Sequence, residues 1–313
     1  MTALRVAFAG TPEFARSSLQ ALLGSPHPVV GVFTRPDRPR GRGQHVSASP
    51  VKEAALAGDV PVSQPATLQG GAALDVLASW RADVLVVVAY GVILPQALLD
   101  APRLGSVNVH ASLLPRWRGA APIQRALLAG DATTGITLMR MEAALDAGPI
   151  LLQRSIDIRA TDTCGVLHDE LATLGARTLL EGLDVMAAGL LQPTPQPMEG
   201  VSYAAKIGKS EAIIDWGRSA IEIDRQIRAF NPWPMAQTRL EDDQLRILAA
   251  RLHEGALGPA AIPGSIIAVV DDAIVVQCGD GQLALTQVQR SGRRPVSARE
   301  FAGGRKLPGQ RLG

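Results

Sequence analysis

The chain has 313 residues, of which 47% are hydrophobic and 19% charged, and its formal net charge is only +2. This composition excludes a disordered chain and predicts a globular α/β protein with one large or two ordinary domains, at roughly 150 residues per domain. The near balance of charge excludes a basic protein overall, so any nucleic-acid partner would have to bind to local basic patches.

Six apolar runs in the first half of the chain predict strands, and the first of them is followed by helical periodicity after a Thr-Pro start. Continuous apolar strands of this kind are typical of a parallel sheet that helices cover on both faces. We therefore expect an N-terminal α/β domain with a parallel-rich sheet. The predicted strands are residues 4–10, 28–35, 83–91, 105–112, 135–141 and 149–158.

The composition of the chain changes after a long amphipathic helix, which we expect at 162–190. The next stretch, "LQPTPQPMEG", has three prolines in seven residues and predicts an extended linker. A helix at 219–230 and several short β runs separated by turn signals then indicate a small antiparallel barrel. The predicted organisation is an N-terminal domain at 1–190, a linker at 191–208 and a C-terminal domain at 209–313.

The cysteines and the N-terminus indicate the cellular compartment in which the protein works. Cys164 and Cys278 form no CxxC pair, which argues against a disulfide scaffold or a zinc ribbon and fits a reducing cytoplasm. The first residues do not resemble a signal peptide, and no apolar run approaches the roughly 20 residues that span a bilayer. The histidines show no metal-binding spacing. We expect a soluble cytoplasmic protein that uses no metal and contacts no membrane.

The loop after the first strand, "AGTPEF", is the place where a dinucleotide-binding protein carries its glycines. It lacks GxGxxG, and Thr34 and Arg35 follow the second strand instead of an acidic residue for a ribose. A nicotinamide dehydrogenase is disfavoured, although Arg35 leaves an NADP-linked enzyme open as a minor alternative.

Asn108, His110 and Asp146 form a candidate catalytic set. Asn108 and His110 share one face at the end of a strand, where open α/β sheets bind ligands, and Asp146 lies in a glycine-closed turn. An amide and an imidazole can stabilise an oxyanion, and a carboxylate can orient the imidazole and help to remove a proton. Attack of an amine on an acyl carbon would fit. Spacing alone leaves a purely structural role open, because strand-end histidines and Asp-x-Gly turns are common.

Two clusters of cations lie near opposite ends of the chain. The first is in "TRPDRPRGRGQHV", whose prolines and glycines predict a mobile loop that projects its arginines toward phosphates. A merely solvated loop is the alternative. The second cluster is C-terminal, and together they suggest a polyanion that spans both domains. The cations are Arg35, Arg38, Arg40, Arg42, Arg290, Arg293, Arg294, Arg299, Arg305, Lys306 and Arg311.

The stretch "NVHASLLPRWRG" with the later "LDAGPIL" closely resembles the folate-dependent formyltransferases, whose hallmark is Asn-x-His, Ser-Leu-Leu-Pro and Arg-Gly with a downstream Asp before Gly. Similarity also covers "VAFAGTPEFA", "DVLVVVAYGVILP", "IRAFNPWPMA" and "LPGQRLG". This coverage favours members with a C-terminal domain over glycinamide ribonucleotide formyltransferases. The basic loop and "FNPWPMA" indicate a member that acts on tRNA.

The resemblance implies a Rossmann-like N-terminal catalytic domain and a C-terminal domain similar to an OB-type barrel. It also implies that a monomer transfers the formyl group of 10-formyltetrahydrofolate to the amino group of methionyl initiator tRNA. Asn108 and His110 would hold the formyl oxygen, and Asp146 would tune His110 and assist proton removal. Phe14 would lie near the methionyl side chain, and the run ending "VVVAYG" would wall the pterin pocket. The remaining residues implied are Ser112, Leu113, Leu114 and Pro115 for folate, and Arg35, Arg38, Arg42 and Lys306 for tRNA.

Two rivals stay open on the sequence. A formyltransferase that acts on a sugar amine or small nucleotide would keep the Asn-His-Asp set but would have no use for two basic patches. A non-catalytic RNA-binding protein would keep the patches but not the intact set. Tight tRNA binding would separate the tRNA enzyme from the formyltransferase of small acceptors. Formyl transfer would separate it from the RNA-binding protein.

Overall fold

The computed structural model describes residues 3–40, 45–69, 71–255 and 261–313, without the side chains of Arg40 and His45. The chain divides into two compact units, each built around its own sheet. The first unit comprises Met1–Pro122, Thr133–Asp157 and His168–Ala204, and the second comprises Ile123–Ala132, Ile158–Leu167 and Ala205–Gly313.

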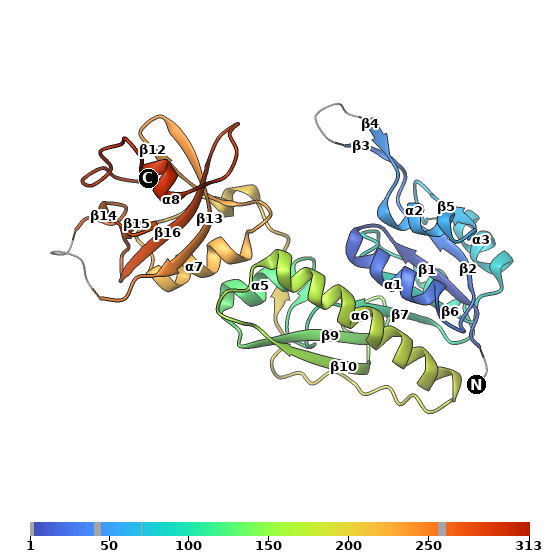
Figure 1. The fold of residues 1–313 in the computed structure, drawn as a ribbon. Helices are drawn as coiled ribbons and strands as arrows, with labels where there is room; N and C mark the ends of the chain where they lie inside the picture. The colour runs from blue at the N-terminus through green and yellow to red at the C-terminus, as the bar shows by residue number, and fades with distance from the viewer. Residues whose placement is uncertain (1–2, 41–44, 70, 256–260) are drawn as a thin grey trace. The chain divides into compact units, whose positions relative to one another are not determined.

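The first unit contains a seven-stranded sheet in the order β10-β9-β7-β6-β1-β2-β5, as Figure 1 shows. Pairing is parallel from β7 to β5, whereas β9 is antiparallel to β7 and β10 is antiparallel to β9. The expected Rossmann-like, parallel-rich sheet is confirmed. The strands are β1 (Val6–Gly10), β2 (Val29–Phe33), β5 (Val62–Ser63), β6 (Val84–Val88), β7 (Ser106–His110), β9 (Thr133–Arg140) and β10 (Ile150–Asp157).

Helices cover both faces of this sheet because its central strands are apolar on both sides. Helix α6 packs closely on β7 and β9, since a Cβ on Gly175 would lie 3.1 Å from the Val109 side chain. On the other face, Leu77 and Leu98 pack in one apolar cluster with Leu85. The helices of this unit are α1 (Glu13–Leu23), α2 (Pro50–Ala57), α3 (Ala72–Trp80), α4 (Gln96–Asp100) and most of α6 (Cys164–Ala187), whereas α5 (Pro122–Ala129) belongs almost wholly to the second unit.

The Pro-rich segment 191–204 is extended and hydrogen-bonded to the first unit, of which it forms part. The backbones of Thr194 and Ile150 exchange two hydrogen bonds of 2.8 Å. Further along, β11 (Tyr203–Ala204) pairs in parallel with β8 (Arg118–Gly119). The segment therefore continues the fold of the first unit up to Ala204.

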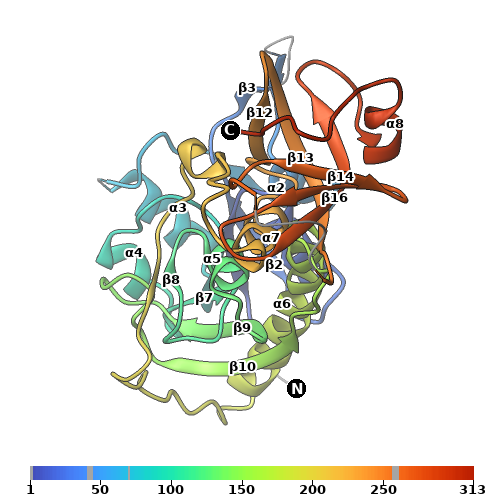
Figure 2. The ribbon, with the colours of Figure 1, turned by 90° about the vertical axis from the view of Figure 1, so that its left-hand side faces the viewer.

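The second unit is a largely antiparallel sheet in the order β12-β13-β16-β15-β14, with β17 paired to β16; Figure 2 shows it with α7 and α8. The sequence did not predict β12, which directly follows the prolines of "NPWPMA". Its elements are η1 (Lys209–Ala212), α7 (Ala220–Ala229), β12 (Ala236–Leu240), β13 (Asp243–Leu252), β14 (Ile266–Val270), β15 (Ala273–Gln277), β16 (Gln282–Arg290), β17 (Val296–Ser297) and α8 (Ala298–Ala302).

Local signals explain where the helices of both units begin. Ser49 caps α2 by accepting a 3.0 Å bond from the Lys52 amide, and Ser219 and Glu222 form a reciprocal capping box on α7. Hydrogen bonds from Arg218 and Ser219 lower the pKa of Glu222 to about 2.

Among the residues that the structure describes, none of the helices combines the length and the apolar character that a membrane span requires.

Candidate active site

Strand β7 carries Asn108 and His110 to one end of the sheet on the same face. Its parallel neighbour β6 pairs Val87 with Asn108, and its antiparallel neighbour β9 pairs Thr137 with His110. Asn108 is half-buried and His110 is buried. Alternation along the strand thus positions an amide and an imidazole beside each other, as the sequence predicted.

The loop that follows β7, residues 111–119, is held by the buried hydroxyl of Thr137. The Thr137 Oγ1 donates to the Ser112 carbonyl oxygen at 2.7 Å and accepts from the Leu114 amide at 3.1 Å. Gln153 Nε2 donates to the Leu114 carbonyl oxygen at 2.9 Å, and Ser112 Oγ donates to the Arg116 carbonyl oxygen at 2.6 Å. The Leu114–Pro115 peptide bond is cis. The loop is irregular in shape but fixed in place.

His110 and Asp146 lie side by side, although 36 positions separate them in the sequence. His110 Nε2 lies 2.9 Å from the Trp117 carbonyl oxygen, which only accepts, so Nε2 carries the hydrogen in this arrangement. His110 Nδ1 faces Asp146 Oδ2 at 3.7 Å, longer than a hydrogen bond, with the two side chains 6% and 14% exposed. The same Oδ2 accepts from the Gly119 amide at 2.8 Å.

The backbone of Asp146 is left-handed, with φ of +47°. Aspartate tolerates this region better than most side chains, and the glycine two residues on permits a close approach. A Cβ on Gly148 would lie 2.0 Å from the Arg140 carbonyl oxygen. The turn therefore requires a glycine at 148 and favours an aspartate at 146, and it places the Asp146 carboxylate beside His110.

Gln196 is a contact residue that sequence reasoning missed. Its Nε2 donates to the carbonyl oxygens of Asp146 and Gly148, both at 2.8 Å, and its Oε1 accepts from Arg118. The sequence held no signal for it, because Gln196 lies 50 positions from Asp146 within the Pro-rich segment.

Phe14 is a buried residue of α1 whose ring meets that of His168 on α6 in an edge-on contact, with ring centres 5.4 Å apart. The His168 side chain is 34% exposed and also contacts Asp169. The placement of Phe14 near a methionyl side chain stays a prediction.

The N-terminal basic segment is partly regular. Instead of an irregular loop throughout, β3 (Arg38–Arg40) and β4 (His45–Ser47) form a hairpin in which Pro39 pairs with Val46. Arg38 is exposed and Arg35 is half-buried, whereas Arg42 lies outside the described residues.

The base of this hairpin is anchored by Asp37. Its carboxylate accepts from Lys52 Nζ at 2.5 Å and from Gln64 Nε2 at 2.8 Å, and Gln64 also donates to the Arg35 carbonyl oxygen. The Lys52 and Gln64 hydrogen bonds hold the pKa of Asp37 below its usual value. This short network fixes the start of the hairpin.

Two cations of the C-terminal patch have acidic partners. Arg290 pairs with Asp243 of β13 at 2.7 Å, and Arg294 pairs with Glu300 at 2.8 Å. Lys306 is exposed. The positive charge of this patch is therefore smaller than a count of its arginines indicates.

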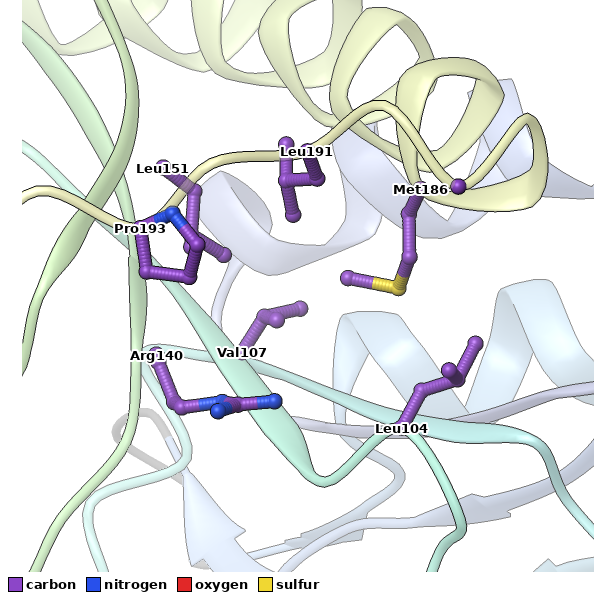
Figure 3. A pocket seen from close by; sticks show the side chains of 8 residues that line it. Leu104, Val107, Arg140, Leu151, Met186, Leu191 and Pro193 are labelled. Carbon is purple, nitrogen blue, oxygen red and sulfur yellow. The ribbon is translucent and has the colours of Figure 1, made fainter.

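A pocket of about 170 Å³ lies on the other face of β7, away from His110 (Figure 3). Val107, whose side chain alternates with that of Asn108, lines it together with Met186 and Arg140. Because His110 and Asp146 do not line it, this pocket is separate from the candidate active site.

No group of three or more acidic, histidine or cysteine side chains suited to a metal occurs among the residues that the structure describes. Burial raises the pKa of the Cys164 and Cys278 thiols to about 12, so both thiols are protonated at neutral pH.

The chain thus has a Rossmann-like sheet with an Asn-x-His pair and an aspartate at one end, and two family models cover most of it. Residues 4–183 match "Formyl transferase", and residues 206–306 match "Formyl transferase, C-terminal domain". The chain belongs to the formyl transferase family.

Relatives from several bacteria are similar over nearly the whole chain. The methionyl-tRNA formyltransferase of Pseudomonas fluorescens is 51% identical over 97% of this chain and 94% of its own length. That of Stutzerimonas stutzeri is 51% identical over 99% and 98%, and that of Chromohalobacter salexigens is 52% identical over 99% and 97%.

Solved structures share the fold at lower identity. An N-formyltransferase from Helicobacter canadensis has a TM-score of 0.69 at 17% identity, over 92% of this chain and 99% of that one. A glycinamide ribonucleotide transformylase from Symbiobacterium toebii has a TM-score of 0.52 at 23% identity, over 60% of this chain and 89% of that one.

Proposed function

We propose that this protein transfers the formyl group of 10-formyltetrahydrofolate to the α-amino group of methionyl initiator tRNA. The observation that carries the proposal is the pair of His110 and Asp146 beside Asn108, in a chain about half identical to methionyl-tRNA formyltransferases along almost its full length. The product would be formylmethionyl-tRNA for translation initiation.

The proposed chemistry is an acyl transfer between two nitrogens. The amine attacks the formyl carbon, a new C–N bond forms, and negative charge develops on the formyl oxygen. The amide of Asn108 stabilises this oxygen, and the imidazole of His110 does so when its Nε2–H exchanges the Trp117 carbonyl oxygen for the formyl oxygen. Asp146 orients His110 and assists removal of a proton from the attacking nitrogen, and the folate nitrogen takes up a proton as its bond to the carbon breaks.

For the folate donor, we assign the backbone of residues 112–115 and the end of β6. Support comes from the hydrogen bonds of Thr137 and Gln153, which fix the carbonyl oxygens of Ser112 and Leu114. A wall held in this way loses little conformational freedom when a ligand binds, which favours affinity. Phe14 is proposed to lie near the methionyl side chain.

For tRNA, we assign Arg38 of the hairpin, Arg35 before it, Arg42, which lies outside the described residues, and Lys306 of the C-terminal patch. Guanidinium groups match phosphate oxygens in charge and geometry, and Arg38 is exposed. Asp37 supports this role because its carboxylate is engaged by Lys52 and so offsets less of the arginine charge.

We also propose that the sheet of the second unit is OB-like, within a C-terminal domain at 209–313. It follows a catalytic domain at 1–190 and a connecting segment at 191–208, of which the part up to Ala204 is hydrogen-bonded to the catalytic domain. Residues 309–313 support closure of the sheet, since Leu312 donates to the Gly264 carbonyl oxygen and Gly313 to that of Arg239. Gly264 closely precedes the edge strand β14, and Arg239 lies within the other edge strand, β12. We further propose that the protein acts as a cytoplasmic monomer.

One experiment tests the function. The purified protein is incubated with 10-formyltetrahydrofolate and methionyl initiator tRNA, and the aminoacyl group is released and analysed for formylmethionine. Parallel reactions replace the acceptor by glycinamide ribonucleotide or by an amino-sugar nucleotide. Formylation of the tRNA is expected; formylation of a small acceptor alone, or tight tRNA binding without any transfer, would overturn the proposal.

A further inference from the structure

The side-chain amide of Gln196 has all its hydrogen-bonding capacity in use. Nε2 donates both hydrogens, to the carbonyl oxygens of Asp146 and Gly148 at 2.8 Å, and Oε1 accepts from Arg118 Nε at 3.0 Å and Nη2 at 2.7 Å. Because a guanidinium only donates, Arg118 fixes which end of the amide faces it, and so directs the N–H groups toward the turn.

These contacts complete a ring around the candidate catalytic aspartate. Arg118 contacts Gln196, Gln196 contacts the backbone of Asp146, and the Asp146 carboxylate accepts from the amide of Gly119, the residue after Arg118. The carboxylate is thus held between a fixed backbone at 146 and a fixed donor at 119. Both constraints act on the group that faces His110 Nδ1 at 3.7 Å.

The left-handed backbone at Asp146 explains why the turn needs the hydrogen bonds of Gln196. A φ of +47° is unfavourable for a residue with a side chain and needs surrounding contacts to persist. Gln196 binds the carbonyl oxygens on both sides of Ala147, so it clamps the turn where it departs from ordinary geometry.

We propose that Gln196 is a positioning residue that acts through Asp146, holding its carboxylate toward His110 during formyl transfer. The proposal rests on the proposed function of the same site. Gln196 itself makes no contact with the reacting atoms in this assignment. Its place in the segment 191–204 means that this segment completes the active site.

A double-mutant cycle tests the proposal. Gln196→Ala is expected to lower kcat on the order of tenfold to a hundredfold, the scale of a misplaced catalytic group, with the KM of both substrates within about twofold of wild type. In the Asp146→Ala background, measured under single-turnover conditions, Gln196→Ala should cause no further loss. An equal loss in both backgrounds, or no loss in either, would overturn the proposal.

Two further variants separate the donor groups from general packing. Gln196→Glu keeps an oxygen for Arg118 but lacks both N–H donors, so it should match Gln196→Ala in kcat; wild-type kcat in this variant would contradict the assignment. Gln226→Ala is the matched control, because Gln226 Nε2 also bridges two carbonyl oxygens, those of Glu211 at 2.7 Å and Ile213 at 3.1 Å, in the second unit. It should lower Tm and leave kcat per folded molecule unchanged.

Hydrogen exchange gives a readout that does not need activity. The Gly119 amide donates to Asp146 Oδ2, so Gln196→Ala should accelerate its exchange, while the Leu114 amide, held by Thr137, keeps its protection. Unchanged exchange at Gly119 would overturn the positioning role. If wild-type protein formed no formylmethionine, the function would fail while this measurement still decided the role of Gln196.

Discussion

The loop 111–119 and the hairpin formed by β3 and β4 are both irregular, proline-bearing stretches of the first unit, but they are held in different ways. The loop is tied along its length, by Thr137 at residues 112 and 114 and by Ser202 and Asp146 at residues 117 and 119. The hairpin is tied at its base, through Asp37.

This difference corresponds to the work that we assign to each. Acyl transfer depends on reacting groups held to within a fraction of an ångström, so a loop that lines the reaction site needs support at many points. Phosphate contact depends mainly on charge, which acts over several ångströms and tolerates variation in side-chain position. The comparison predicts large, specific effects of changes at the loop and graded, salt-dependent effects at the hairpin.

The strongest effect is expected at the reacting groups. His110→Ala or Asp146→Ala should lower turnover by at least about two orders of magnitude, the scale of a lost oxyanion donor or acid–base group. Turnover is measured with purified protein and both substrates, and His253→Ala serves as the histidine control. Near-normal turnover in both variants would remove these residues from the mechanism.

The next effect concerns the support of the loop. Thr137→Val keeps the shape but removes the hydroxyl that serves Ser112 and Leu114, so we expect a loss of about 1–3 kcal/mol in the free energy of unfolding and a raised KM for the folate donor. Thr178→Val is the control, since its equally buried hydroxyl bonds only to the Leu174 carbonyl oxygen within α6. Equal KM values in the two variants would argue against a folate wall at the loop.

A smaller effect is expected at the hairpin. Arg42→Ala should raise the apparent KM for tRNA and reduce the slope of log affinity against log salt by about one, because one phosphate contact is lost. Arg38→Ala should behave similarly, and folate binding should stay unchanged in both. An unaltered salt slope in both variants would make the hairpin a solvated surface feature.

The smallest effect concerns the anchor of the hairpin at low pH. The pKa of Asp37 is lowered in the folded protein, so its contribution to stability is complete above the ordinary carboxyl pKa and is lost as pH falls through the lowered value. Acid should therefore release the hairpin base only below about pH 4, the ordinary range of an aspartate. NMR signals of Arg38 and Ser47 followed during acid titration provide the measurement. Loss of these signals at pH 6 would contradict the anchoring role.

Much of the first unit was predictable because its strands are continuous apolar runs and its first helix has clear periodicity. The placement of Asn108 and His110 on one face of the same strand followed from alternation alone. Asp146 was a candidate from its glycine-closed turn, and its role beside His110 came from the resemblance to a family. The short strand β5 and the polar strand β12 carried no such signal. Tertiary pairing defines them, through Val32 for β5 and the neighbouring β13 for β12.

The supporting contacts were beyond sequence reasoning for a different reason. Gln196 and Ser202 act through hydrogen bonds to residues 50 and 85 positions away, and neither lies in a periodic element or a motif. Likewise, Asp243 neutralises Arg290 from the paired strand β13, 47 positions away in the sequence. Such contacts depend on how the chain returns upon itself, which local patterns do not encode.

The hydrogen-bonded path of residues 194–204 along the first unit has a consequence for dividing the chain. A cut at residue 190, where the amphipathic helix ends, would discard Gln196, Ser202 and the strand that pairs with Arg118. A cut after Ala204 would keep them. Chimaeras that exchange C-terminal domains between relatives should therefore be joined beyond Ala204, so that each catalytic half retains its own closing strand.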